Sequence, residues 1–202
     1  MLGSVLLSSA YLGPVSYYRA VASSDHVCVE QYDHYHKQTY RNRCRILTGN
    51  GVMDLSVPVV NTGGKMCVKD LRIAYVENWQ QVHWRAIASA YNSSPFFEYY
   101  RDDLEPFYTR KTEFLIDLNM ELMRVVMDLI GLKTEVSLSD DYLEGTSSIH
   151  DLREAFSPKS PTSSPLKPYY QVFDQKFGFV SDMSVLDLLF NMGPESILCL
   201  KF

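Results

Sequence analysis

Val5-Leu6-Leu7-Ser8-Ser9-Ala10-Tyr11-Leu12-Gly13-Pro14, residues 5–14, is the stretch of the chain that decides the fold. Its apolar start predicts a buried strand that ends at Ser8 or Ser9. A turn follows, and Pro14 suits the first turn of a helix because its φ angle is already fixed near the helical value. We expect this helix to run through about Ala22. An alternating run at residues 26–30 predicts the next strand.

Hydrophobic periodicity predicts the elements that follow. Residues 40–59 are typical of a β-hairpin, because two strand-like runs flank the turn cluster Gly49-Asn50-Gly51. Residues 68–76 alternate apolar and polar side chains and predict another strand. Helices are expected at residues 79–91, from residue 95 toward 105, and between residues 112 and 131. The expected N-caps are Asn78, Ser94 and Thr112, and Gly131 is the expected C-terminal glycine. Residues 135–138 predict one more short strand.

These elements predict an α/β domain at residues 1–156. A mixed sheet from residues 3–76 is expected to pack against the helices of residues 78–131. Residues 157–168 contain four of the nine prolines and predict an extended loop. Residues 169–202 are rich in apolar side chains. We expect them to pack on the body as a C-terminal appendage, because each Å² of apolar surface left in water costs about 25 cal/mol.

Composition excludes several classes of protein. The 202 residues are 46% hydrophobic and 21% charged, as in ordinary globular proteins, and the net charge of −5 argues against a nucleic-acid partner. No apolar run approaches the roughly 20 residues of a membrane helix. The apolar start has no Lys or Arg before Pro14, which favours a strand over a signal peptide. Four widely spaced cysteines, at positions 28, 44, 67 and 199, predict free thiols and a cytoplasmic location.

The densest group of functional side chains is the run Glu-Gln-Tyr-Asp-His-Tyr-His-Lys-Gln-Thr-Tyr-Arg-Asn-Arg at residues 30–43. Period two places Arg41, Arg43 and Arg45 on one face of a predicted strand. Three like charges repel, so this row needs either a bound anion or paired carboxylates. With Lys37 it could bind a phosphate or carboxylate, because arginine presents a planar fork of donors. The alternative is a solvated edge strand whose charges discourage aggregation.

Two residues are candidates for proton transfer. Glu30 ends a predicted strand, where α/β sheets commonly present functional groups. It could accept a proton or a sugar hydroxyl, or form a salt bridge with a nearby arginine. Arginines beside it would keep it ionised and make it a poor base, which favours binding. His83 lies one helical turn after Trp79 and is either an acid–base catalyst or a core histidine bonded to a carbonyl.

Further candidates each have a plain structural alternative. The side chains of Trp79, Trp84 and Tyr91 could stack on a sugar or base, although aromatic residues at helical spacing usually belong to a core. Ser94 precedes a predicted helix whose amides could hold an anion, and capping explains it equally well. Another strand-end site could involve Ser8, Ser9 and Tyr11. A metal site is not expected: His26, His34 and His36, with Asp33 and Glu30, lack a second ligand pair at helix or hairpin spacing.

Several stretches in this order resemble the WbqC-like protein family over nearly the whole chain. They are residues 6–14, Glu30 with Tyr35-x-Lys37-Gln38-x-x-Arg41-Asn42-Arg43, residues 55–59, Trp79-x-x-x-His83-Trp84, residues 90–100, Phe177-Gly178-Phe179 and residues 186–191. The tail pattern resembles a branch of the family that is common in Bacteroides-type bacteria. The chain departs from many members at the first strand, where Ser8-Ser9-Ala10 replaces a common His-Gln-Pro.

The resemblance implies a transferase of bacterial surface-polysaccharide (O-antigen-like) biosynthesis, and glycine or acyl transfer has been suggested for members. We expect it to bind an anionic donor or nucleotide-sugar without a cofactor. Glu30 or His83 would handle the proton. The expected ligand-binding residues are Tyr35, Lys37, Gln38, Arg41, Asn42, Arg43, Trp79, Tyr91 and Ser94. The alternative is a non-catalytic binding or scaffold protein of the same pathway. The sequence is compatible with either a monomer or a homo-oligomer.

Overall fold

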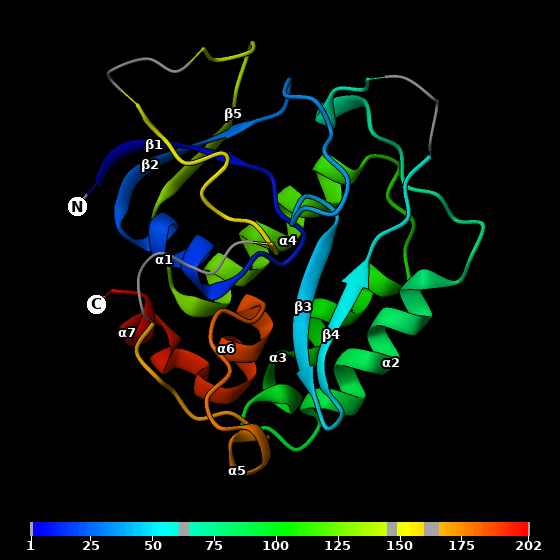
Figure 1. Cartoon of the computed structure of the whole chain (residues 1–202), viewed down its shortest axis with the longest axis vertical. Helices are drawn as coiled ribbons and strands as arrows, with labels where there is room; N and C mark the ends of the chain where they lie inside the picture. Colours follow the sequence, from blue (N-terminus) through cyan, green and yellow to red (C-terminus); the bar gives the residue numbers. More distant parts are fainter. Residues whose placement is uncertain (1, 61–64, 145–148, 160–165, 202) are drawn as a thin grey trace.

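The computed structural model describes residues 2–60, 65–144, 149–159 and 166–201 (Figure 1). Half of the predicted Pro/Ser-rich loop, residues 160–165, therefore lies outside the described residues. Strands near the N-terminus are followed by helices from the middle of the chain and by further helices at the C-terminal end. The predicted α/β class is confirmed.

A four-stranded parallel sheet forms one part of the fold. Its strands are β1 (Leu2–Ser8), β2 (Ser24–Glu30), β5 (Glu135–Leu138) and β6 (His150–Asp151). Their order is β5-β2-β1-β6, and every neighbouring pair is parallel. Side chains on both faces of the central strands are buried, as Leu6 and Leu7 show. All four strands therefore end at one edge of the sheet, where Ser8, Glu30 and the segments after β5 and β6 meet.

A separate antiparallel hairpin consists of β3 (Arg43–Thr48) and β4 (Gly51–Ser56). The predicted mixed sheet is thus divided into a parallel sheet and a hairpin. Gly51 has a φ angle of 105° at the turn, a value that L-residues rarely adopt. The hairpin lies beside α2 (Trp79–Tyr91) and reaches away from the parallel sheet (Figure 1).

The described residues also form α-helices. They are α1 (Val15–Ala22), α2, α3 (Phe97–Leu104), α4 (Leu115–Ile130), α5 (Asp174–Phe177), α6 (Val185–Met192) and α7 (Ser196–Leu200). Three short 3-10 helices are η1 (Val68–Asp70), η2 (Glu105–Tyr108) and η3 (Gly193–Glu195). The predicted start and end of α2 are confirmed. Gly131 follows α4 with a φ angle of 80°, so the predicted C-terminal glycine is confirmed as well.

Some local predictions were wrong. The expected strand at residues 68–76 begins as η1 and forms only single bridges, Val59 with Ile73 and Arg72 with Phe114. The side chains do alternate, because Leu71 and Ile73 are buried, but no strand among the described residues pairs with this segment in a ladder. The expected caps Ser94 and Thr112 are not at the helix starts, where Phe96 and Phe114 stand.

The C-terminal segment contributes to the core. Helix α6 is buried along most of its length, and it contacts α1, α3 and β3. The backbone N–H of Ser184 donates to the carbonyl of Arg45, so the segment before α6 bonds to the outer edge of β3. Figure 1 shows α6 and α7 grouped near α1, far in sequence but close in space. Among the described helices, none has the length and apolar character that a membrane crossing needs.

Candidate functional site

Glu30 is buried at the carboxyl edge of the parallel sheet. Its Oε1 accepts hydrogen bonds from the backbone N–H of Tyr32 and the hydroxyl of Ser139, each at 2.8 Å. Its Oε2 accepts from the backbone N–H of Leu143 at 2.9 Å and lies 3.6 Å from Nη1 of Arg153. Glu30 is only 1% exposed, so these contacts use both oxygens and leave no open face. The carboxylate therefore joins the loops after β2 and β5 and has no lone pair turned toward solvent.

Arg153 follows β6 and brings a partly buried guanidinium to this edge. Its Nε and Nη2 donate to the carboxylate of Asp151, and the shortest of these bonds is 2.6 Å. Hydrogen bonding from Arg153 lowers the pKa of Asp151, and the same pairing raises the pKa of Arg153. The guanidinium also lies over the ring of Tyr142, 5.3 Å from its centroid. These three hydrogen bonds fix the direction of both side chains.

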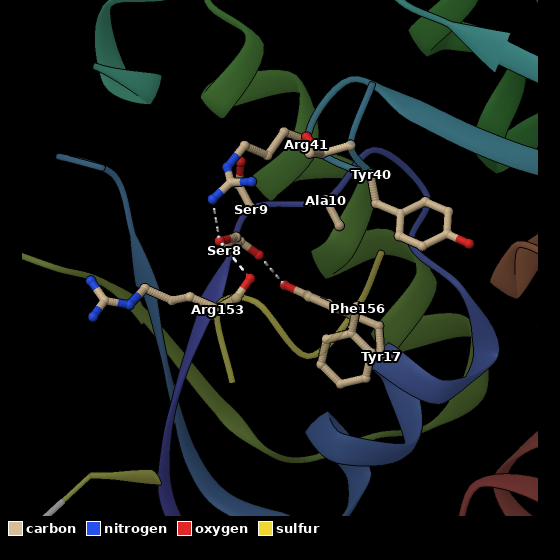
Figure 2. A pocket seen from close by; sticks show the side chains of 9 residues that line it. Ser8, Ser9, Ala10, Tyr17, Tyr40, Arg41, Arg153 and Phe156 are labelled. Atoms are coloured by element: carbon tan, nitrogen blue, oxygen red, sulfur yellow. Dashed lines mark hydrogen bonds between the residues drawn. The ribbon is translucent and has the colours of Figure 1, made fainter. Parts of the chain in front are cut away.

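Arg41 points toward the end of β1 from the loop before the hairpin (Figure 2). Its Nη2 lies 2.9 Å from the hydroxyl of Ser8, 2.7 Å from Oδ2 of Asp33 and 3.4 Å from Oε1 of Glu154. Ser8 in turn donates to the carbonyl of Arg153, and Tyr17 donates to the carbonyl of Ser8. Arg41 thus connects β1, the loop after β2 and the segment after β6.

The cavity behind Ser8 has about 10 Å³ of free space. That volume is enough for about one water molecule. The residues around it include Ser9, Tyr40 and Phe156 (Figure 2). It is too small for a substrate and can serve only to hydrate the buried polar groups of this edge.

A larger hollow of about 530 Å³ opens beside Arg153 at the same edge. It is lined by Asp33, Tyr142, Asp151, Arg153, Glu154 and Ala155. Three of these six side chains are carboxylates, and two of them, Asp33 and Glu154, contact Arg41. The hollow combines hydrogen-bond acceptors, one guanidinium and one aromatic ring, and it has the size of a small-molecule site.

The three arginines of the predicted row, Arg41, Arg43 and Arg45, do not all lie together. The prediction that Arg41 shares a strand face was wrong, because β3 begins only at Arg43. Arg43 and Arg45 do lie together, and each pairs with Asp54 of β4, at 3.0 and 3.2 Å. Of the two alternatives that the sequence left open, the described structure supplies paired carboxylates. The amide of Asn42 donates to the carbonyl of Val57 and holds the open end of the hairpin.

Other residues of the predicted binding run lie outside the hollow. Lys37 and Gln38 are exposed in the loop before the hairpin, and Gln38 has a φ angle of 61°. Tyr35 is half-buried against the core, and its backbone N–H donates to the carbonyl of Met66. Burial raises the pKa of Tyr35. Of the expected ligand-binding set, Arg41 is the member whose side chain contacts residues of the hollow.

His83 lies in the core between α2 and the hairpin. Its Nδ1 is 3.0 Å from the hydroxyl of Tyr11, which is 3.0 Å from the hydroxyl of Tyr108. The ring of Trp79 packs edge-on against His83, with centroids 5.1 Å apart. Burial lowers the pKa of His83 to about 4, partly opposed by a hydrogen bond with the backbone of Ser56. The described structure does not bring His83 into contact with Glu30 or Arg41, and its neutral ring is an interior hydrogen-bonding group.

Tyr91 and Ser94 are also interior residues. The hydroxyl of Tyr91 donates to Asp187 at 3.0 Å and accepts from the backbone N–H of Leu47. Ser94 donates to the carbonyl of Tyr91 at the end of α2. These contacts leave neither hydroxyl free to hold a ligand.

The sequence did not point to Tyr142, Asp151, Arg153 or Glu154. β6 has only two residues, too few to show a period, and its pairing with β1 brings Arg153 to the edge. The alternation of charge in residues 150–154 is the one signal that the chain offers. Within the described ranges, no group of three or more His, Cys, Asp or Glu side chains is arranged to hold a metal ion.

Comparisons with known proteins show which family this chain resembles. The model of the WbqC-like protein family matches residues 9–158, well over half of the 202 residues. A protein of Mycobacterium tuberculosis, "Uncharacterized protein Rv1507c", is 27% identical over 95% of this chain and 94% of its own length. No solved structure matches the chain. Because this relative is mycobacterial, the assignment holds for the family and does not extend to the Bacteroides-type branch. The chain belongs to the WbqC-like protein family.

Proposed function

We propose that the protein binds a sugar in the 530 Å³ hollow during the biosynthesis of bacterial surface polysaccharide. The observation that carries this proposal is the lining of the hollow, in which Asp33, Asp151 and Glu154 face one guanidinium and the ring of Tyr142. Carboxylates accept hydrogen bonds from hydroxyl groups, and an aromatic ring can pack against the apolar face of a sugar. The pathway is the one that the family resemblance implies.

The charges around the hollow indicate which part of a ligand it binds. Asp33, Asp151 and Glu154 carry three negative charges, against two positive charges on Arg153 and Arg41. A diphosphate would add negative charge to this surface and be repelled. A nucleotide-sugar would therefore place its sugar here and its phosphates outside, where Lys37 is exposed.

Two functions are consistent with sugar binding. Transfer of an acyl or glycyl group needs a base beside the acceptor hydroxyl, and Glu154 is the candidate because 81% of its side chain is exposed. Non-catalytic binding is favoured by a different observation: Glu30, Asp33 and Asp151 are each paired with an arginine in the described structure. Hydrogen bonding from Arg153 lowers the pKa of Asp151, so this carboxylate is a weak base.

The four free cysteines support a reducing compartment, and we place the protein in the cytoplasm as part of this proposal. Two of the thiols, Cys28 and Cys44, are buried. Burial raises the pKa of both, so neither is poised to act as a nucleophile.

Titration with sugars tests the proposal. Nuclear magnetic resonance spectra recorded with neutral hexoses, uronic acids and nucleotide-sugars should show shifts confined to the residues around the hollow. Tyr142→Ala should weaken binding about tenfold or more, because an aromatic contact in a binding site contributes of the order of 1–2 kcal/mol.

Tyr99→Ala is the matched control, since Tyr99 is a highly exposed tyrosine on α3. It should leave every sugar affinity unchanged. If no sugar shifts the residues around the hollow, or if the two variants behave alike, the proposal fails. Transfer is then separated from binding by incubating the protein with a bound sugar and an acyl or glycyl donor and measuring the product by mass spectrometry.

A further inference from the structure

The guanidinium of Arg41 is buried but incompletely paired. Arg41 is 4% exposed, and all three polar contacts that the described residues give its guanidinium are made by Nη2. Its Nε is buried and has no hydrogen-bond partner among the described residues. A guanidinium has five N–H donors, and a buried donor without an acceptor is costly. The guanidinium of Arg41 therefore has capacity for another acceptor.

The two carboxylates on Arg41 are not equivalent. Asp33 lies 2.7 Å from Nη2 with a side chain that is 18% exposed, whereas Glu154 lies 3.4 Å away and is 81% exposed. A long contact to an exposed carboxylate contributes little stability. Glu154 can thus move into solvent at small cost, while Asp33 remains in place.

We propose that Glu154 occupies the place of a ligand carboxylate, and that the sugar bound here is an acidic one, a uronic acid. This inference rests on the proposed sugar site. The ligand carboxylate would replace Glu154 on Arg41 charge for charge, so the balance of charges in the hollow would not change. Arginine and carboxylate match in shape and form short, charge-assisted hydrogen bonds. The hydroxyl groups of the same sugar then face Asp33 and Asp151, which line the hollow.

The charges in the hollow favour a ligand carboxylate over a phosphate ester. A phosphate monoester carries nearly two negative charges at neutral pH, so it would add charge when it displaced Glu154. A uronic acid carries one. Sugar acids with a single charge and several hydroxyls therefore fit the hollow better than sugar phosphates.

The test compares affinities for matched pairs of sugars. Glucose with glucuronate, and galactose with galacturonate, differ within each pair only by the carboxylate. Titrations by nuclear magnetic resonance should give a higher affinity for the acid of at least one pair. Glu154→Gln should then raise the affinity for that acid about tenfold relative to its neutral partner, because the competing carboxylate is removed.

Glu98→Gln is the control. It removes an exposed carboxylate that lies 3.5 Å from Arg101, and this pair resembles Glu154 with Arg41 in its distance and in the exposure of its carboxylate. This variant should change no affinity. Both substitutions replace exposed side chains, and equal melting temperatures would show that folding is preserved.

The outcomes separate the two proposals. If neutral sugars bind and the acids gain nothing from Glu154→Gln, the acidic ligand is excluded and the sugar site survives. If Glu154→Gln weakens binding of the acid, Glu154 is itself a ligand-binding residue and the inference is overturned. Absence of binding for every sugar overturns both.

Discussion

Nη2 of Arg41 lies 2.7 Å from Oδ2 of Asp33 at the carboxyl edge of the parallel sheet, and the arginine of this ion pair is buried while the carboxylate is partly exposed. Removing one partner of a buried pair leaves an uncompensated charge in the interior. Asp33→Ala should therefore lower the free energy of unfolding by about 3 kcal/mol. Urea denaturation followed by circular dichroism measures the change.

Glu154→Ala is the comparison, because its contact with the same nitrogen is long and exposed. It should change the free energy of unfolding by no more than about 0.5 kcal/mol. Equal losses in the two variants would show that Arg41 does not depend on Asp33.

Replacing Asp187 by asparagine should destabilise the folded protein. Its carboxylate accepts hydrogen bonds from Tyr91 at 3.0 Å, Tyr169 at 2.7 Å and Gln171 at 2.6 Å. In Asp187→Asn an NH₂ group must face at least one of these donors, and the expected loss of stability is about 3 kcal/mol. Thermal and urea unfolding measure it. Asp102→Asn, at a side chain that is 90% exposed, should cost less than about 0.5 kcal/mol. A stable Asp187→Asn protein would contradict the role of the carboxylate as acceptor.

Burial raises the pKa of Asp187, and the hydrogen bonds it accepts oppose that rise. A carboxyl group with a raised pKa in the folded state holds its proton more tightly when folded. Its contribution to stability is thus present at low pH and is lost as pH rises through the folded-state pKa. Asp187→Asn should remove this part of the pH dependence in the mildly acidic range, which unfolding measured at several pH values would detect.

His83 should make the fold sensitive to acid. Burial lowers its pKa to about 4 from an ordinary 6.5, so the unfolded chain takes up a proton before the folded one does. Its contribution is complete above pH 6.5 and is lost as pH falls toward 4, at up to about 1.4 kcal/mol per pH unit. His83→Gln should flatten this slope in urea unfolding. His36→Gln, at an exposed histidine, should leave the slope as it is. An unchanged slope in His83→Gln would show that other groups cause the acid sensitivity.

Gly193 should not tolerate a side chain. It follows α6 with a φ angle of 53°, and a Cβ there would lie 2.5 Å from Cδ1 of Phe96. Gly193→Ala should lower the free energy of unfolding by about 3 kcal/mol or more, from backbone strain and overlap together. Gly178 also has a positive φ angle, 67°, but open space around its Cα. Gly178→Ala therefore measures strain alone, and an equal loss in both variants would mean that contact with Phe96 adds nothing.

Much of the secondary structure could be read from the chain, because its causes are local. The stripe of apolar side chains predicted α2 and α4, and Gly131 fixed the end of α4. The strand expected at residues 68–76 failed because a strand needs a neighbour, and only single bridges reach it. Asn78, the expected cap of α2, is in position but bonds to Gln81 rather than to the helix backbone.

The sequence by itself determined the α/β class and the family resemblance, and it named Glu30 and Arg41 as candidate functional residues. Only the tertiary structure decided which charges meet. Arg43 pairs with Asp54 across the hairpin, whereas Arg41, two residues earlier, turns to Asp33 at the sheet edge. Periodicity follows from the geometry of a single strand or helix, so a short stretch of chain reveals it. The pairing of charges depends on contacts between distant segments, such as β6 beside β1, and no local pattern encodes them.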